Sequence, residues 1–165
     1  MDYNRFYLYH SIGTYIKSSI LRNFNEGGRP AKWKPSKRAA KGVWHARKKM
    51  MIAGKTLIDK SILRNSIKYT VKDNEIIVGT NVKYAKIHNY GGKISKTVDV
   101  RPHKRTITKL FGKPISAKDV DVRKHERNMT INMPARPFMV LQKTDIAFIT
   151  KKIKDYTDNH LGAKP

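Results

Sequence analysis

The sequence predicts an α+β domain in which a small antiparallel sheet is flanked by an N-terminal and a C-terminal helix. Apolar residues recur every three or four positions near both ends, which is the period of a helix, and a β-hairpin pattern lies between them. The length of 165 residues is that of one ordinary domain. We therefore expect a single domain over 1–165, with a basic loop or hairpin excursion at 93–133 and a flexible tail at 160–165.

The first helix is expected from Arg5 to Phe24. Gly27 and Gly28 follow and end it, since glycine readily takes the left-handed conformation found after helices. Its apolar stripe consists of Leu8, Ile12, Tyr15, Ile16, Ile20 and Phe24.

Two prolines rule out a regular element in the loop 29–35, and Trp33 between them is expected to pack this loop onto the body of the protein. A second helix can start after Ser36, a good N-cap residue, and run to about Ala53. An ordered basic loop is the other interpretation of this stretch.

The middle of the chain carries the clearest local signal. Apolar and polar residues alternate over 67–72, Asp73-Asn74 is typical of a tight turn, and 75–79 runs back as a second strand. A short turn of helix is predicted before this hairpin at 62–67. Residues 83–90 are predicted to form a short helix, which Gly91 and Gly92 end.

Residues 93–134 read as an elaborated hairpin or a long basic loop. Strand character appears at 97–100, 105–108 and 129–133, and 111–114 reads as a turn. The last helix is predicted over 144–159, with an apolar stripe of Ile146, Ile149, Ile153 and Tyr156. No internal repeat is evident.

Charge is the unusual bulk property, because 36 Lys and Arg face 12 Asp and Glu for a net charge of +24. The excess is +11 in residues 1–56 and +8 in 93–141, but only +3 in 57–92. A localised basic surface indicates a polyanionic neighbour, either nucleic acid or an acidic protein face. A lysine-rich solvated surface without a partner would give the same composition.

No catalytic constellation emerges from the sequence. The chain has no cysteine, no Gly-x-Ser-x-Gly elbow and no phosphate-binding glycine loop, and its six histidines lie singly. Asp119 and Asp121 could share one face of a strand and hold a hard cation, but two solvated carboxylates are the simpler interpretation. We expect no enzyme activity, no cofactor and no metal. Any DNA contact should be electrostatic and non-specific, because no base-reading motif is present.

A family resemblance is carried by three blocks of sequence and, upstream of them, by Phe24, Gly28, Pro30 and Trp33-Lys34-Pro35. Residues 57–67 read Leu-Ile-Asp-Lys-Ser-Ile-Leu-Arg-Asn-Ser-Ile, and 78–92 read Val-Gly-Thr-Asn-Val-Lys-Tyr-Ala-Lys-Ile-His-Asn-Tyr-Gly-Gly. Pro-Ala-Arg-Pro-Phe follows at 134–138. In this order they resemble the virion morphogenesis family of Mu-like phages, which includes P2-type tail completion proteins. Lys60-Ser61 departs from the family's Thr-Gly, so that turn must be built without glycine.

The resemblance marks a set of residues with structural or interface roles. Thr80 and Asn81 are expected to start the helix after them, and Tyr84, Ile87 and His88 to pack on the sheet with the imidazole hydrogen-bonded to a neighbour. The full set is Trp33, Asp59, Leu63, Arg64, Ser66, Gly79, Thr80, Asn81, Tyr84, Ala85, His88, Gly91, Gly92, Arg136, Pro137 and Phe138.

A second set holds the basic residues expected to contact DNA or an acidic surface. Its members are Arg29, Lys32, Lys34, Lys37, Arg38, Arg47, Lys48, Lys49, Arg101, Lys104, Arg105, Arg123, Lys124 and Arg127.

The resemblance implies a structural virion protein of a tailed phage, acting in tail completion or in joining head to tail. Its expected partners are further copies of itself in a hexameric ring, neighbouring tail-tube, neck or connector proteins, and genomic DNA in the lumen. The alternative is a free, non-specific DNA-binding protein. The chain shows no signal peptide and no apolar stretch of membrane-spanning length, so we expect it in the host cytoplasm during assembly and then in the virion.

Overall fold

The computed structural model describes residues 3–45, 50–52, 54–72 and 74–160, and it describes no side chains for 43–53. It divides the chain into two compact units, residues 92–133 and the remainder. The first unit contains all five helices and two strand pairs, and the second consists of strands alone. The predicted α+β class is confirmed.

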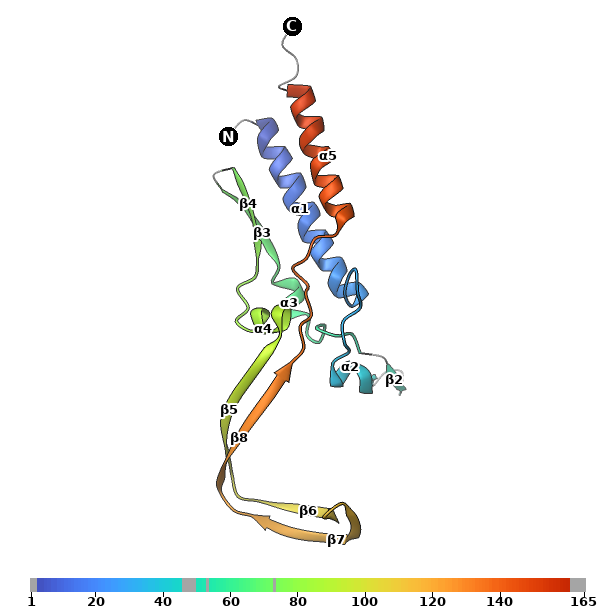
Figure 1. The fold of residues 1–165 in the computed structure, drawn as a ribbon, viewed down its shortest axis with the longest axis vertical. Coiled ribbons are helices and arrows are strands. Elements are labelled where there is room, and N and C mark those ends of the chain that lie inside the picture. Colours follow the sequence, from blue (N-terminus) through green and yellow to red (C-terminus); the bar gives the residue numbers. More distant parts are fainter. Residues whose placement is uncertain (1–2, 46–49, 53, 73, 161–165) are drawn as a thin grey trace. The chain divides into compact units, whose positions relative to one another are not determined.

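Helix α1 (Tyr3–Glu26) is the longest element, and its predicted apolar stripe is confirmed. Ile12, Ile20 and Phe24 are buried. Figure 1 shows α5 (Lys143–His160) running beside it, and the Tyr15 ring stacks on Phe148 of α5 with centroids 3.9 Å apart.

The stretch after Ser36 differs from its prediction. Ser36 is the N-cap, and its Oγ accepts a hydrogen bond from the amide of Ala39 at 3.1 Å. However, α2 (Lys37–Lys41) lasts only five residues, because Gly42 takes φ +78°. Strands β1 (Val43–His45) and β2 (Met50–Ile52) then pair antiparallel, where we had expected helix or loop.

The central hairpin is confirmed. After α3 (Ile62–Asn65), strand β3 (Lys68–Lys72) pairs antiparallel with β4 (Glu75–Gly79), with Lys72 opposite Glu75. Asn74 takes φ +66° in the connection, a conformation that asparagine tolerates well. Both strands contact α1.

Helix α4 (Ala85–Tyr90) confirms the short helix, but not its predicted start. Tyr84 is its N-cap residue, and no side chain caps it. Thr80 instead bonds the amide of Val82 at 3.2 Å and the hydroxyl of Ser66 at 2.6 Å, which ties the end of β4 to the end of α3.

The predicted stripe of α5 is turned inward only in part, because Ile149 and Tyr156 are half-buried and the other two residues are not. Asp145 is buried and Phe148 packs on Tyr15, whereas Ile146 and Ile153 are 55% and 47% exposed. The pattern therefore identified the helix correctly, but a polar contact sets its rotation.

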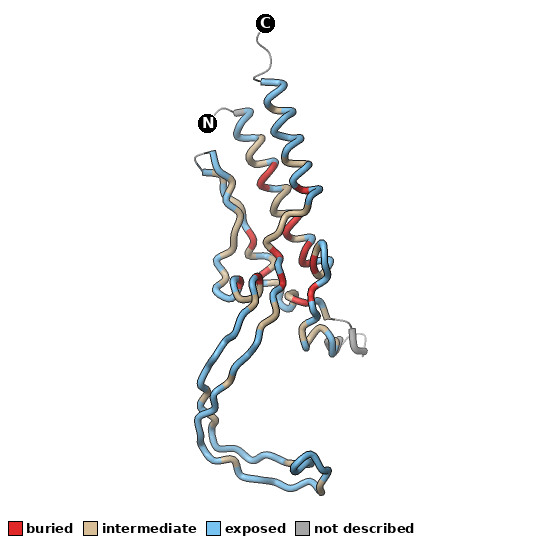
Figure 2. The backbone as a smooth tube through the Cα atoms, viewed as in Figure 1, coloured by how far each residue is buried: buried red, intermediate tan, exposed pale blue. Residues whose placement is uncertain are grey.

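One apolar cluster holds the first unit together, and Figure 2 shows its buried backbone near the lower half of α1. The Phe24 ring lies 5.0 Å from Phe138 and 5.9 Å from Trp33, measured between centroids. Ile20, Leu63, Ile67 and Ala85 complete the cluster. Residues far apart in sequence thus meet at one point, and the predicted packing role of Trp33 is confirmed.

The second unit is a two-stranded ribbon. Strand β5 (Gly92–Val100) pairs antiparallel with β8 (His125–Met133), and β6 (His103–Leu110) pairs with β7 (Lys113–Val122). The elaborated hairpin is therefore the correct interpretation of this segment. Phe111 and Gly112 form its tip at φ +48° and +79°, and Phe111 is 96% exposed.

Arg47, Lys48 and Lys49 lie outside the described residues, as do 161–165 of the expected flexible tail. Among the described helices, none has the length and apolarity needed to cross a membrane.

Ser61 offers a test of how the turn before α3 is built. This non-glycine residue takes φ +59° and ψ +11°, a left-handed conformation that costs about 1 kcal/mol for a residue with a side chain. We expect Ser61→Gly to raise the free energy of unfolding by roughly 0.5–1 kcal/mol, measured by chemical denaturation. The control is Ser18→Gly on the exposed side of α1, where the same change should destabilise. If both changes destabilise, the left-handed geometry is wrong.

Candidate functional site

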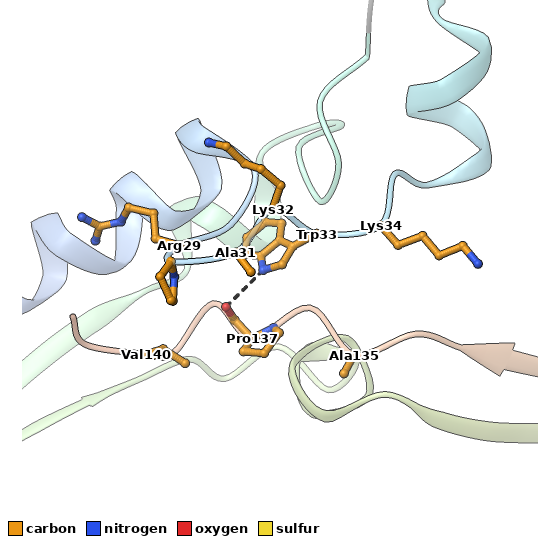
Figure 3. A pocket seen from close by; sticks show the side chains of 9 residues that line it. Arg29, Ala31, Lys32, Trp33, Lys34, Ala135, Pro137 and Val140 are labelled. Carbon is orange, nitrogen blue, oxygen red and sulfur yellow. Dashed lines mark hydrogen bonds between the residues drawn. The ribbon is translucent and has the colours of Figure 1, made fainter. Parts of the chain in front are cut away.

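The segment 134–142 is the centre of the first unit, although it has no regular secondary structure. The amide of Arg136 donates to the His88 carbonyl at 2.9 Å, and its Nε donates to the Lys34 carbonyl at 3.1 Å. Trp33 Nε1 donates to the carbonyl of Pro137 at 3.2 Å (Figure 3). The segment therefore lies between the loop of Trp33 and helix α4.

Two asparagines complete this attachment, and neither role was predicted from the sequence. Asn89 Oδ1 accepts from the amides of Phe138 and Met139 at 3.0 and 3.1 Å. Asn23 Nδ2 donates to the carbonyls of Phe138 and Val140 at 2.8 and 2.9 Å. Both side chains are buried, so water does not replace them as hydrogen-bond partners. They supply the hydrogen bonds that a neighbouring strand would otherwise give to this backbone.

A buried carboxylate joins α1 to α5. Asp145 accepts hydrogen bonds from Ser19 at 2.5 Å, from the Gln142 amide at 2.8 Å and from Tyr15 at 3.2 Å. The Arg29 guanidinium lies 3.8 Å from it. Burial acts to raise the pKa of Asp145, but the hydrogen bonds and the charge of Arg29 outweigh it, so the pKa is below its usual value.

Arg29 has a structural role in this network. Its Nε donates to Asn23 Oδ1 at 2.8 Å, and Nη2 donates to the carbonyl and hydroxyl of Ser19, both at 2.7 Å. Its donors thus point inward. Contact with DNA through Arg29 stays a prediction, but the inward bonding does not favour it.

His88 differs from its expectation. Its Nδ1 is buried and has no hydrogen-bond partner among the described residues, where a bonded imidazole was predicted. Burial and the nearby charge of Arg136 lower the pKa of His88, which favours the neutral ring. Burial also lowers the pKa of Arg136. Tyr84, which is exposed, meets the His88 ring edge-on at 5.7 Å between centroids.

The remaining residues of the family blocks are spread around this centre. Arg64 donates to Asn65 Oδ1 at 3.3 Å, although its Nε is buried without a partner in the described structure. Asp59 is exposed and lies 3.7 Å from Arg38. Gly79 ends β4, Asn81 is exposed, and Gly91 ends α4 at φ +72° before Gly92 starts β5.

The predicted basic contacts fall into two groups. In the first unit Lys32, Lys34 and Lys37 are exposed, and Lys32 caps the Glu26 carbonyl at 2.7 Å. Arg38 is half-buried and donates to the Ile58 carbonyl at 2.6 Å. Six others lie in the ribbon, all of them exposed: Arg101, Lys104, Arg105, Arg123, Lys124 and Arg127.

Two further features of the described residues bear on chemistry. A shallow hollow lies beside Trp33, bordered by Arg29, Lys32 and Val140 among others (Figure 3). No group of three or more His, Asp or Glu side chains comes together in the described ranges. Asp119, which with Asp121 we had considered as a cation ligand, accepts a hydrogen bond from Thr106 at 2.6 Å.

Comparison with known proteins identifies the family. The model of the phage virion morphogenesis family matches residues 2–162. The chain belongs to this family. It is also 32% identical over 149 residues to "Mu-like prophage FluMu G protein 2" of Haemophilus influenzae, an alignment that covers 90% of this chain and 75% of that protein. No solved structure matches.

Family membership gives this chain a function connected with the phage virion. It also confirms the resemblance drawn from the three sequence blocks. The family segment at 134–138 has a geometric explanation here: Phe138 fills the core, Arg136 and Pro137 fix the loop of Trp33, and Ala85 packs beside them.

The Asp145 network was not predicted from the sequence, although one signal in the sequence indicates it. Asp145 is the third residue of α5, a position where an acid commonly bonds the amide that begins the helix. Reading Gln142 and Asp145 as a capping pair would have turned Asp145 inward. With Asp145 facing α1, Ile146 and Ile153 would have been predicted to lie outside the contact with α1.

The Asp145 network predicts a pH-dependent stability. Because the folded-state pKa is lowered, ionised Asp145 stabilises the fold above about pH 4, and this contribution is lost as pH falls through the folded pKa. Asp145→Asn should cost roughly 3 kcal/mol at pH 7, because it leaves Arg29 without its carboxylate. Urea unfolding from pH 7 to pH 2 measures both effects.

The difference between the variant and the wild type should shrink toward low pH. Asp155→Asn, an exposed change on the same helix, is the control and should stay within about 0.5 kcal/mol of wild type. A constant difference at all pH values would contradict the assigned role of Asp145.

Proposed function

We propose that this chain is a structural virion protein of a tailed phage that acts in tail completion or in head-to-tail joining, as a subunit of a ring. The proposal rests on the virion family together with one structural observation. Every described strand belongs to a sheet of only two strands. Each such sheet has two edges whose backbone groups face outward and can pair with another chain.

A two-stranded sheet is marginally stable by itself in water. The described strands form four such pairs, and apolar side chains are exposed on strands and helices. Surfaces of this kind are expected of a subunit before neighbouring subunits cover them. Exposed Ile77 on β4 and Ile131 on β8 are examples. The chain therefore supports a role in assembly better than a role as a finished monomer.

A ring follows from symmetry in this proposal. Identical subunits that meet through two different surfaces form closed rings when the rotation between them closes. Six subunits match the symmetry we expect of the tail. The other partners are tail-tube, neck or connector proteins, assembly takes place in the host cytoplasm, and the finished ring stays in the virion.

We also propose that the role involves no catalysis. The buried polar side chains of the described core hold backbone or one another, as Asn23, Asn89 and Asp145 do. They join segments distant in sequence, which is the work of a scaffold.

The alternative is a free, non-specific DNA-binding protein, favoured by the net charge of +24. Mass spectrometry of purified phage particles separates the two. Peptides of this chain in a fixed ratio to other particle proteins support the virion role, and their absence from particles would overturn it. Electron microscopy of the purified protein should show rings of tail diameter, whereas monomers at all concentrations would contradict ring formation.

Ile153 provides a sharper test of self-association. It lies seven positions after Ile146, so both occupy one exposed apolar face of α5, away from the α1 contact. Ile153→Glu should weaken association about tenfold or more if this face meets a second copy, with the thermal midpoint unchanged. Light scattering coupled to size-exclusion chromatography measures the mass.

The matched control is Ala147→Glu, which adds the same charge at an exposed position on a different face of the helix. Equal loss of association in both variants would indicate a general charge effect and would count against this face as the interface.

A further inference from the structure

The ribbon contains a short repeat that was not recognised in the sequence. Residues 98–105 read Val-Asp-Val-Arg-Pro-His-Lys-Arg, and 120–127 read Val-Asp-Val-Arg-Lys-His-Glu-Arg. Valine, aspartate, valine, arginine, histidine and arginine recur at the same places. Eight residues are too few to show as a domain repeat, and only the pairing of the strands gives them meaning.

The two copies face each other across the ribbon. In the β5–β8 ladder Val98 lies opposite Arg127 and Val100 opposite His125. In the β6–β7 ladder the same pairs recur with the copies exchanged, since Val120 lies opposite Arg105 and Val122 opposite His103. We call residues 98–105 and 120–127 together the paired repeat.

The point where the ladders meet is equivalent in both copies. Neither Arg101-Pro102 nor Arg123-Lys124 belongs to a strand, so the ladder is interrupted on both sides. His103 Nδ1 lies 2.9 Å from the Arg101 carbonyl, and His125 Nδ1 lies 2.9 Å from the Arg123 carbonyl. The two copies therefore share their local geometry as well as their sequence.

Charge is separated between the faces of each ladder. Directly opposed residues share a face of an antiparallel pair. In the first ladder the valine pairs share their face with no carboxylate, whereas Asp99 and Glu126 lie together on the other. In the second ladder, Asp119 and Asp121 likewise lie on the face opposite the valine pairs.

The acid-free face of each ladder is thus both apolar and cationic. It carries two valines, an arginine and a histidine from the paired repeat. The ion pairs of Asp145 with Arg22 and Arg29, and of Asp59 with Arg38, lie in the first unit. The arginines and lysines of the paired repeat are exposed, so their charge is directed to solvent.

We propose that the paired repeat binds duplex DNA through its phosphate backbone. It would be the nucleic-acid contact of the virion subunit proposed above, and in that sense it rests on that function. The major groove of B-DNA is about 12 Å wide and admits a two-stranded β-ribbon. Planar guanidinium groups bind phosphate by paired hydrogen bonds.

The dimensions agree with this partner. Strand residues advance about 3.3 Å each, so the eight residues from Val98 to Arg105 span at most about 23 Å, because Arg101-Pro102 belong to no strand. Duplex DNA carries a phosphate on each strand every 3.4 Å of its axis. Arg127 in the first ladder and Arg105 in the second can therefore each meet phosphates from the acid-free face of their own ladder, without reading bases.

The experiment is a titration of fluorescent random-sequence duplex DNA with the full-length protein at several salt concentrations. The test variant changes Arg101, Arg105, Arg123 and Arg127 to Gln. It should bind at least about tenfold more weakly at 100 mM salt, and the slope of log K against log salt should flatten by about 3. The corresponding four Arg→Lys changes keep the charge, so the slope should stay within about 1 of wild type, although the paired hydrogen bonds to phosphate are lost.

The control variant removes the same charge elsewhere, by changing the exposed Lys83, Lys86, Lys151 and Lys154 to Gln. It should flatten the slope by less than 1. If the test and control variants weaken binding equally, overall charge drives binding and the proposal is wrong.

A variant with only two changes controls for unfolding of the ribbon. Arg101→Gln with Arg123→Gln lies outside both ladders, so it should leave the strands intact, and it should flatten the slope by about 2. Wild-type DNA affinity in this variant and in the fourfold variant, with loss of incorporation into particles, would identify an acidic protein as the partner and overturn the DNA proposal. Absence of the wild-type chain from particles would reject the virion role but leave the titration result standing.

Discussion

The first unit depends on how the chain re-enters it after the ribbon. The returning segment 134–142 has no strand or helix to satisfy its backbone, and unpaired polar groups inside a protein are costly. Side chains supply what secondary structure does not: Asn89 bonds two of its amides, Asn23 two of its carbonyls and Trp33 a third. Phe138 can then enter the core, where it meets Phe24. Without this anchoring, α5 would have no fixed start.

The small size of the core explains the exposed apolar surfaces. Buried hydrophobic residues are few for the described chain, and most gather in one cluster around Phe24. The described strands occur only in pairs, so none of the described sheets is wide enough to bury a face of its own. A protein built in this way leaves its edges and apolar faces for other molecules. That is the physical reason for preferring an assembly role over a role as an isolated catalyst.

Local patterns predicted the elements better than their contacts. The stripe of α1, the hairpin with its turn at Asn74 and the packing of Trp33 follow from periodicity and turn chemistry, and the structure confirms them. The rotation of α5 could not be predicted from apolar spacing, because Asp145 turns toward α1 to meet Ser19 and Arg29. The short strands after Gly42 were missed because each has only three residues, too few to show a period of two. Of the candidate site, the family blocks gave the core residues. Asn89 lies in the block 78–92 but was given no role, and Asn23 and Asp145 lie outside the blocks.

The ribbon shows how a short sequence repeat acquires a structural meaning when its strands are paired. Register runs unchanged from Gly92 opposite Met133 to Ile107 opposite Lys118, although the ladder is interrupted between its two parts. This is possible because the interruption has two residues on each strand, Arg101-Pro102 and Arg123-Lys124. Proline contributes here by removing an amide donor from the ladder. One residue more on one side would shift the register and move every later side chain to the other face. Because the two interruptions are equal in length, the pair Val98–Arg127 and the pair Val120–Arg105 occupy equivalent places in their ladders. This equivalence arises only because both strands carry the repeat.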